Sequence, residues 1–158
     1  MAKKEQSTPM QIFDMVCEVL RTTGLQHNYN KNELVVVCSY AGAKSAHQFV
    51  MKVDKERELI MFGEQLQIKV KDDKKDDMAK AVCVANGHIG MGRFLYDLDS
   101  TISYEIIQSY SGCVINPVFI QRTLVMFLTT LERYESRFEL LNKGKIDVEN
   151  FYKANDDK

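Results

Sequence analysis

The chain has 158 residues, of which 21 are basic and 22 acidic, so its formal net charge is −1. Its 45% hydrophobic and 27% charged residues are typical of a globular domain that buries a core without a disulfide or a metal. A nearly neutral chain has no overall field to attract nucleic acid or an anionic membrane surface. We therefore expect neither as a partner.

The cysteines favour a reducing compartment. Cys17, Cys38, Cys83 and Cys113 show no C-x-x-C spacing, and each has apolar neighbours, which predicts buried free thiols. The first residues are polar, and no apolar run approaches the ~20 residues of a membrane span. We expect a cytoplasmic protein that holds no cofactor.

The first predicted element is a helix over residues 9–23, preceded by a flexible arm of residues 1–7. Thr8-Pro9 is a typical helix start, because the hydroxyl caps the first turn and proline fits the first helical position. Apolar residues then recur every three or four positions as far as Leu20, and Gly24 ends the helix.

Three strands are predicted next, over residues 33–40, 46–53 and 58–70. The first is rich in β-branched residues, and the other two alternate between apolar and polar side chains. Gly63 interrupts the third strand and indicates a bulge or a bend. Short turns between the three predict an antiparallel meander.

A second helix is predicted to begin at Asp72, in an acidic first turn, and to end at Asn86-Gly87. Strands over residues 91–98 and 101–110 then form a hairpin with Asp99-Ser100 at its tip.

A long helix is predicted to begin at Asn116-Pro117 and to end at Lys143-Gly144, and residues 145–158 form a polar tail with room for a short turn from Val148 to Tyr152. The predicted order is helix, three strands, helix, two strands, helix. That order predicts an α+β single domain with an antiparallel sheet of about five strands.

Sequence motifs predict no catalytic, cofactor-binding or metal-binding residue. The glycines of NGHIGMGRF follow a helix and precede a strand, the reverse of a phosphate-binding loop. Gly42-Ala43-Lys44-Ser45 lacks the first glycine of a Walker A loop and the helix that follows it. Asp97 and Asp99 are simple turn formers, because calcium-loop residues are missing downstream.

The histidines give no zinc signature. His27, His47 and His88 are far apart in the sequence, and none lies at ligand spacing from another ligating side chain. A pairing of His88 with Cys113 in space would be a chance one, because no strand-to-turn nucleophile motif accompanies it.

The long helix carries the feature that exceeds an ordinary core stripe. One apolar stripe contains Ile120 and Leu124, and a second side carries the candidate partner or dimer surface: Val118, Phe119, Val125 and Met126. A helix apolar on two sides requires cover on both. The second side therefore lies against the chain's own elements, or against another subunit or partner.

The segments NGHIGMGRFLYDLDSTISYEIIQ, SGC and NPVFIQRTLVMFLTTLERYESRFELL carry a family resemblance. With the preceding elements they resemble the type III secretion chaperone-like fold, and within it the YbjN-like family of bacterial sensory transduction regulators. The resemblance covers residues 8–144 as one domain. It implies a small cytoplasmic protein, a homodimer that binds protein partners without cofactors, and no binding residue carries over.

The leading functional expectation is a non-enzymatic protein-interaction module of chaperone-like or regulatory type. The alternative is a small-molecule-sensing domain or a small enzyme with a pocket between sheet and helices. In that alternative the pocket would take polar groups from His47, His88, Arg93 and Tyr96.

Overall fold

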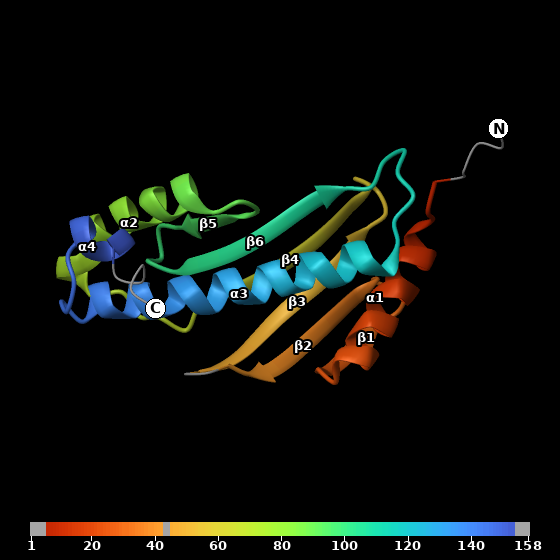
Figure 1. Ribbon diagram of the computed structural model, residues 1–158, viewed down its shortest axis with the longest axis horizontal. Coiled ribbons are helices and arrows are strands. Elements are labelled where there is room, and N and C mark those ends of the chain that lie inside the picture. Colours follow the sequence, from red (N-terminus) through yellow and green to blue (C-terminus); the bar gives the residue numbers. More distant parts are fainter. Residues whose placement is uncertain (1–5, 43–44, 154–158) are drawn as a thin grey trace. The chain divides into compact units, whose positions relative to one another are not determined.

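A computed structural model describes residues 6–42 and 45–153 (Figure 1). In this part of the chain the fold is α+β, with one antiparallel sheet of six strands in the order β1-β2-β3-β4-β6-β5. The strands are β1 (Gln26–Asn30), β2 (Val35–Ala41), β3 (Ala46–Asp54), β4 (Leu59–Gln65), β5 (Arg93–Tyr96) and β6 (Ile102–Ser109). The helices are α1 (Pro9–Thr23), α2 (Lys75–His88), α3 (Pro117–Asn142) and α4 (Val148–Lys153), and a 3-10 turn, η1 (Asp72–Lys74), precedes α2.

The described chain divides into two compact units, where the sequence predicts a single domain. The first unit contains the residues up to Glu64 together with Ile106–Phe127. The second contains Gln65–Glu105 and the residues from Leu128 onward. Strand β6 and helix α3 each contribute residues to both units.

Helix α1 of the first unit has the predicted bounds. Thr8 and Gln11 form a capping box, in which each side chain bonds the backbone N–H of the other residue. Gly24 ends the helix with a φ of 74°, a conformation that glycine adopts without strain. The buried face of α1 packs on β3.

The sheet of the first unit buries one face. In the antiparallel register, Phe49 of β3 lies opposite Cys38 of β2, and Met51 lies opposite Phe62 of β4. These four side chains are buried. The ring centroid of Phe127, from α3, lies 5.4 Å from that of Phe49 and 6.0 Å from that of Phe62.

Two features of this sheet differ from the sequence prediction. Strand β1, the sixth strand, was not predicted because its side chains are polar and almost all exposed, which leaves no apolar alternation to detect. It forms through backbone pairing with β2. The sequence also indicates a bulge or a bend at Gly63, but the strand has no bulge there on the β3 side, since Gly63 pairs with Val50 in the regular register.

The predicted strand over residues 58–70 is only half a strand. Strand β4 ends at Gln65, although Leu66, Ile68 and Val70 continue the buried alternation. The Leu66 N–H donates to the C=O of Ile102 at 2.8 Å, and Ile102 is where β6 begins. Beyond Leu66, the segment has no strand of the described chain beside it.

The second unit is built around an aromatic cluster. Phe94 of β5 lies 5.2 Å from Phe138 of α3, measured between ring centroids, and Phe138 lies 5.0 Å from Phe151 of α4. Figure 1 shows α2 beside β5 and α4, which it contacts. Residues 148–153 are therefore helical, with Phe151 fully buried, where the sequence predicts a polar tail.

The side chain of Asn86 joins α2 to strand β5. Its amide nitrogen donates to the C=O of Phe94 at 2.9 Å, and the Phe94 N–H donates to its amide oxygen at 2.7 Å. Strand β5 is at the edge of the sheet. The amide therefore satisfies backbone groups that have no strand beside them.

We expect Asn86→Ala to lower the free energy of unfolding by about 1–3 kcal/mol, because it leaves two part-buried backbone groups without a partner. Denaturant unfolding followed by circular dichroism measures this. Asn28→Ala, at an exposed position of β1, is the matched control, with an expected change within about 0.5 kcal/mol. Equal effects of the two substitutions would contradict the role of Asn86.

Candidate functional site

The predicted second stripe of α3 is a surface in the first unit. Val118 and Val125 are each 54% exposed and Met126 is 39% exposed, whereas Phe119 is less accessible than the two valines. Of the two covers expected for the second apolar side, the described residues of the chain therefore supply little at these three side chains. Val114, which precedes the helix, is a further exposed apolar side chain, with 49% of its surface accessible. We call Val114, Val118, Phe119, Val125 and Met126 the α3 face.

The α3 face carries a single basic side chain. Arg122 is exposed and lies one helical turn from both Val118 and Met126, so it adjoins the apolar groups. Among the described residues it makes no ion pair. An apolar patch that includes one arginine has the composition of the central part of a protein–protein interface.

A second arrangement lies around His47, also in the first unit. The imidazole Nδ1 lies 2.8 Å from Glu64 Oε1, and its Nε2 lies 3.1 Å from Ser45 Oγ. The side chains of His47 and Glu64 are only 2% and 3% exposed. We call Ser45, His47 and Glu64 the His47 array.

The strands position the array through their register. Tyr40 pairs with His47 across β2 and β3, and their rings stack with centroids 4.7 Å apart and planes 15° apart. Gly63 pairs with Val50, which places Glu64 on the same face and diagonal to His47. A Cβ on Gly42 would lie 2.7 Å from His47 Cδ2, so glycine is needed where the turn approaches the ring.

The sequence reasoning singled out His47 but missed Ser45 and Glu64. A signal was present, because His47 precedes Phe49 and Met51 in the buried alternation of β3, and Glu64 follows Ile60 and Phe62 in that of β4. Their contact with each other depends on the register between the strands, which no local pattern supplies. The Lys44 position of the Walker-like motif lies outside the described residues.

A pocket of about 530 Å³ borders the array. Its wall combines the link between α1 and β1 with strands β1, β2 and β3, and its lining residues are Gly24, Leu25, Gln26, Ser39, Tyr40, Ala41, Ala46, His47 and Gln48. A pocket between sheet and helix is what the alternative functional expectation requires. Of its four proposed polar groups, however, only His47 lines this pocket.

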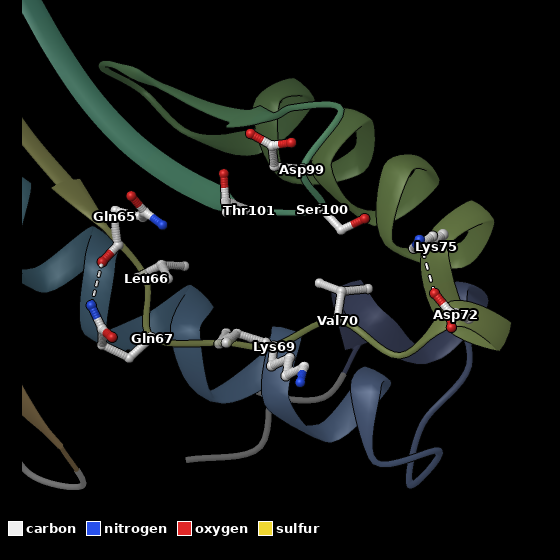
Figure 2. Close-up of a pocket in the computed structure, with 11 residues that line it drawn as sticks. Gln65, Leu66, Gln67, Lys69, Val70, Asp72, Lys75, Asp99, Ser100 and Thr101 are labelled. Atoms are coloured by element: carbon white, nitrogen blue, oxygen red, sulfur yellow. Dashed lines mark hydrogen bonds and ion pairs between the residues drawn. The ribbon is translucent and has the colours of Figure 1, made fainter.

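Another pocket, of about 450 Å³, lies within the second unit (Figure 2). The extended segment 65–70 forms one side, and the turn residues Asp99, Ser100 and Thr101 form the other. Lys75 Nζ bonds Asp72 Oδ1 at 2.9 Å at one end. That hydrogen bond lowers the pKa of Asp72 and raises the pKa of Lys75, so both groups are ionised near neutral pH.

The other residues that the sequence singled out lie apart from this pocket, and among the described residues the buried hydroxyl of Tyr96 has no hydrogen-bond partner. Arg93 bonds Glu105 at 2.6 Å across β5 and β6. The carboxylate of Asp97 accepts from the N–H of Asp99 at 3.0 Å, as expected of a turn former. His88 belongs to the second unit and Cys113 to the first, so no single unit brings them together.

The prediction of four buried cysteines is correct only in part. Cys38 is buried, and burial raises the pKa of its thiol to about 12. Cys83 and Cys113 are exposed, because Cys83 lies on the outer side of α2 and Cys113 in the loop before α3. In the described residues, no three His, Cys, Asp or Glu side chains cluster closely enough to hold a metal ion.

No protein-family model matches the chain, and no curated protein matches it. Within the described residues, none of the helices has the length and apolar character that crossing a bilayer requires.

We expect Gly42→Ala to destabilise the first unit by about 1–3 kcal/mol, because the new methyl group would overlap the held ring of His47. Thermal or denaturant unfolding measures the loss, and the His47 ring resonances in NMR report its displacement. Gly87→Ala is the control, since a methyl group there would have no atom within 4 Å. Wild-type stability and unchanged ring resonances in Gly42→Ala would contradict this account of His47.

Proposed function

We propose that the chain is a protein-interaction module of chaperone-like or regulatory type, and that the α3 face is its binding surface. The observation that carries the proposal is the exposure of Val118, Val125 and Met126 on one side of a helix whose other side is core. Exposed apolar groups gathered in this way mark interaction sites more often than chance surface.

A second copy of the chain is the occupant that we propose for the α3 face. Val118 and Val125 are two helical turns apart, about 10 Å along the axis. An antiparallel crossing on a two-fold axis between them brings each Val118 against the Val125 of the other copy, which makes the contact self-complementary. Arg122 can cover apolar surface with its stem while its guanidinium stays in water.

The α3 face forms the centre of such an interface. A stable dimer buries roughly 800 Å² on each partner, more than a few valine and methionine side chains supply. Within this face, Val114 and Phe119 widen the apolar area, and Gln121 and Arg122, each one helical turn from Val118, add polar groups beside it.

The proposal includes the family and the location. A YbjN-like protein of the type III secretion chaperone-like fold would be a small, homodimeric, partner-binding protein of the cytoplasm. Four free cysteines without a disulfide support a reducing compartment. The six-stranded antiparallel sheet flanked by helices supports the α+β class, and the finer fold assignment is part of the proposal.

We expect Val125→Glu and Met126→Glu to convert a dimer of the chain into monomers, because each places a charge in the apolar centre. Size-exclusion chromatography with light scattering measures the mass. Gln48→Glu, which adds the same charge on the exposed face of the sheet, opposite the face that packs on α3, should remain dimeric. A monomeric wild-type chain at high micromolar concentration, or glutamate variants that stay dimeric, would reject the homodimer.

The His47 array supports a second candidate function, a small acyl-transfer enzyme. A hydroxyl, an imidazole and a carboxylate in hydrogen-bonded sequence is the arrangement that activates a serine nucleophile. Ser45 Oγ would attack an ester carbonyl as His47 Nε2 takes its proton, and the departing alcohol would receive that proton. Water would then cleave the acyl-serine and release the acid.

This second candidate is tested with p-nitrophenyl acetate and a fluorophosphonate label. We expect slow ester hydrolysis and labelling in the wild type, and loss of both in Ser45→Ala and His47→Gln. Ser39→Ala is the control, because Ser39 lines the same pocket but pairs with Gln48 in the strand register, one position along from His47. Absence of hydrolysis and labelling in the wild type would assign the array to stability alone.

A further inference from the structure

The pocket of the second unit borders a stretch of backbone that is extended but belongs to no strand. Residues 66–70 alternate between buried and exposed side chains as a strand does, yet β4 ends at Gln65. We propose that this segment binds an extended peptide of a partner protein as an added β-strand, through the pocket in Figure 2. The site lies in the second unit, so it goes beyond the proposed use of the α3 face.

Three hydrogen bonds show which neighbour each edge of the segment faces. The N–H of Leu66 donates to the C=O of Ile102 at 2.8 Å. The backbone N–H and C=O groups of the even-numbered residues therefore point toward β6. The C=O of Lys69 accepts from Asn142 Nδ2, and the N–H of Lys71 donates to Asn142 Oδ1, both at 2.9 Å. Because alternate residues of an extended chain direct their polar groups to opposite edges, Asn142 occupies the odd-numbered edge at Lys69 and Lys71.

Among the described elements, the even-numbered edge has no strand beside it at Ile68 and Val70, whose side chains are buried. In the part of the chain that the structure describes, no backbone hydrogen bond joins either residue to another segment. These two residues have no strand partner because β6, the neighbouring strand, starts only at Ile102, after the turn at Asp97–Ser100. Two N–H and two C=O groups with strand spacing consequently border the pocket.

The occupant follows from these groups. Unpaired backbone donors and acceptors at strand spacing select another extended backbone, and two ladder positions correspond to about three or four peptide residues at ~3.3 Å each. A folded helix or a rigid small molecule offers no matching series of backbone groups.

The opposite wall adds a charge preference. Asp99 lines the pocket, is exposed, and makes no ion pair among the described residues. Lys75 at the pocket end is already bonded to Asp72, and Figure 2 shows the Lys69 ammonium directed away from Asp99. Leu98, on the same turn as Asp99, is fully exposed. We therefore assign the site to an extended peptide with a lysine or arginine facing Asp99.

The test uses the full chain and a library of capped octapeptides with a central lysine or arginine and randomised flanks without proline or cysteine. A matched library carries glutamate at the central position. Amide hydrogen exchange by NMR reads the backbone directly. We expect saturating basic peptide to slow exchange at Ile68 and Val70 by about tenfold or more, and to leave Gln67 and Lys69, on the other edge, unchanged.

Two pairs of variants separate the pocket from general surface effects. Asp99→Lys should weaken binding by about tenfold or more, whereas Glu149→Lys, the same charge change outside the pocket, should not. Thr101→Trp should block the pocket, whereas Ser103→Trp, two residues further along the chain and outside the lining, should bind normally. Fluorescence anisotropy with a labelled library hit gives the affinities.

Several results would overturn the proposal. These are protection of Ile68 and Val70 already in the free chain, exchange that slows equally on both edges, binding that favours the glutamate library, and absence of any peptide that affects these amides. A monomeric chain that still binds peptide would reject the homodimer but leave this site standing. A dimer that binds no peptide would do the reverse.

Discussion

Satisfaction of backbone hydrogen bonds at the ends of strands is the constraint on which the fold depends. Where a neighbouring strand ends, a side chain, solvent or a binding partner has to take its place beside the backbone. Two asparagine amides do so in the second unit, Asn86 at Phe94 and Asn142 at Lys69 and Lys71. A side-chain amide carries both donor and acceptor atoms, so it can stand in for a neighbouring peptide group.

The buried polar groups of the first unit obey the same rule. His47 and Glu64 lie on the covered face of the sheet at positions where apolar side chains would be expected, and they bond each other there. Burial of such groups costs free energy unless they are paired. The ring of Tyr40 stacks on the imidazole of His47, and the absence of a side chain at Gly42 leaves room for that imidazole. These contacts, together with the hydrogen bond to Glu64, hold the imidazole in one orientation.

Local pattern predicted the elements that bury one face. Helix α1 has the predicted bounds because its cap, proline and terminal glycine are all local signals. Strand β1 and the burial of Phe151 escaped prediction, since the first depends on backbone pairing and the second on contact with Phe138 of α3. For the candidate sites, helical periodicity placed Val118 and Val125 on one side of α3. It could not show whether another part of the chain covers that side. The open edge at Ile68 and Val70 depends on where the neighbouring strand starts, which is a property of the sheet.

The first unit is built from two separate stretches of the sequence, and this has a consequence for folding during synthesis. Its strands β1–β4 are complete by Gln65, but the helix that brings Phe127 against Phe49 and Phe62 comes only after the second unit's strands have been made. A nascent chain therefore presents four strands whose apolar face has only α1 to cover it. Closing the core afterwards requires a contact between residues far apart in sequence, which is slow and leaves the intermediate prone to aggregation.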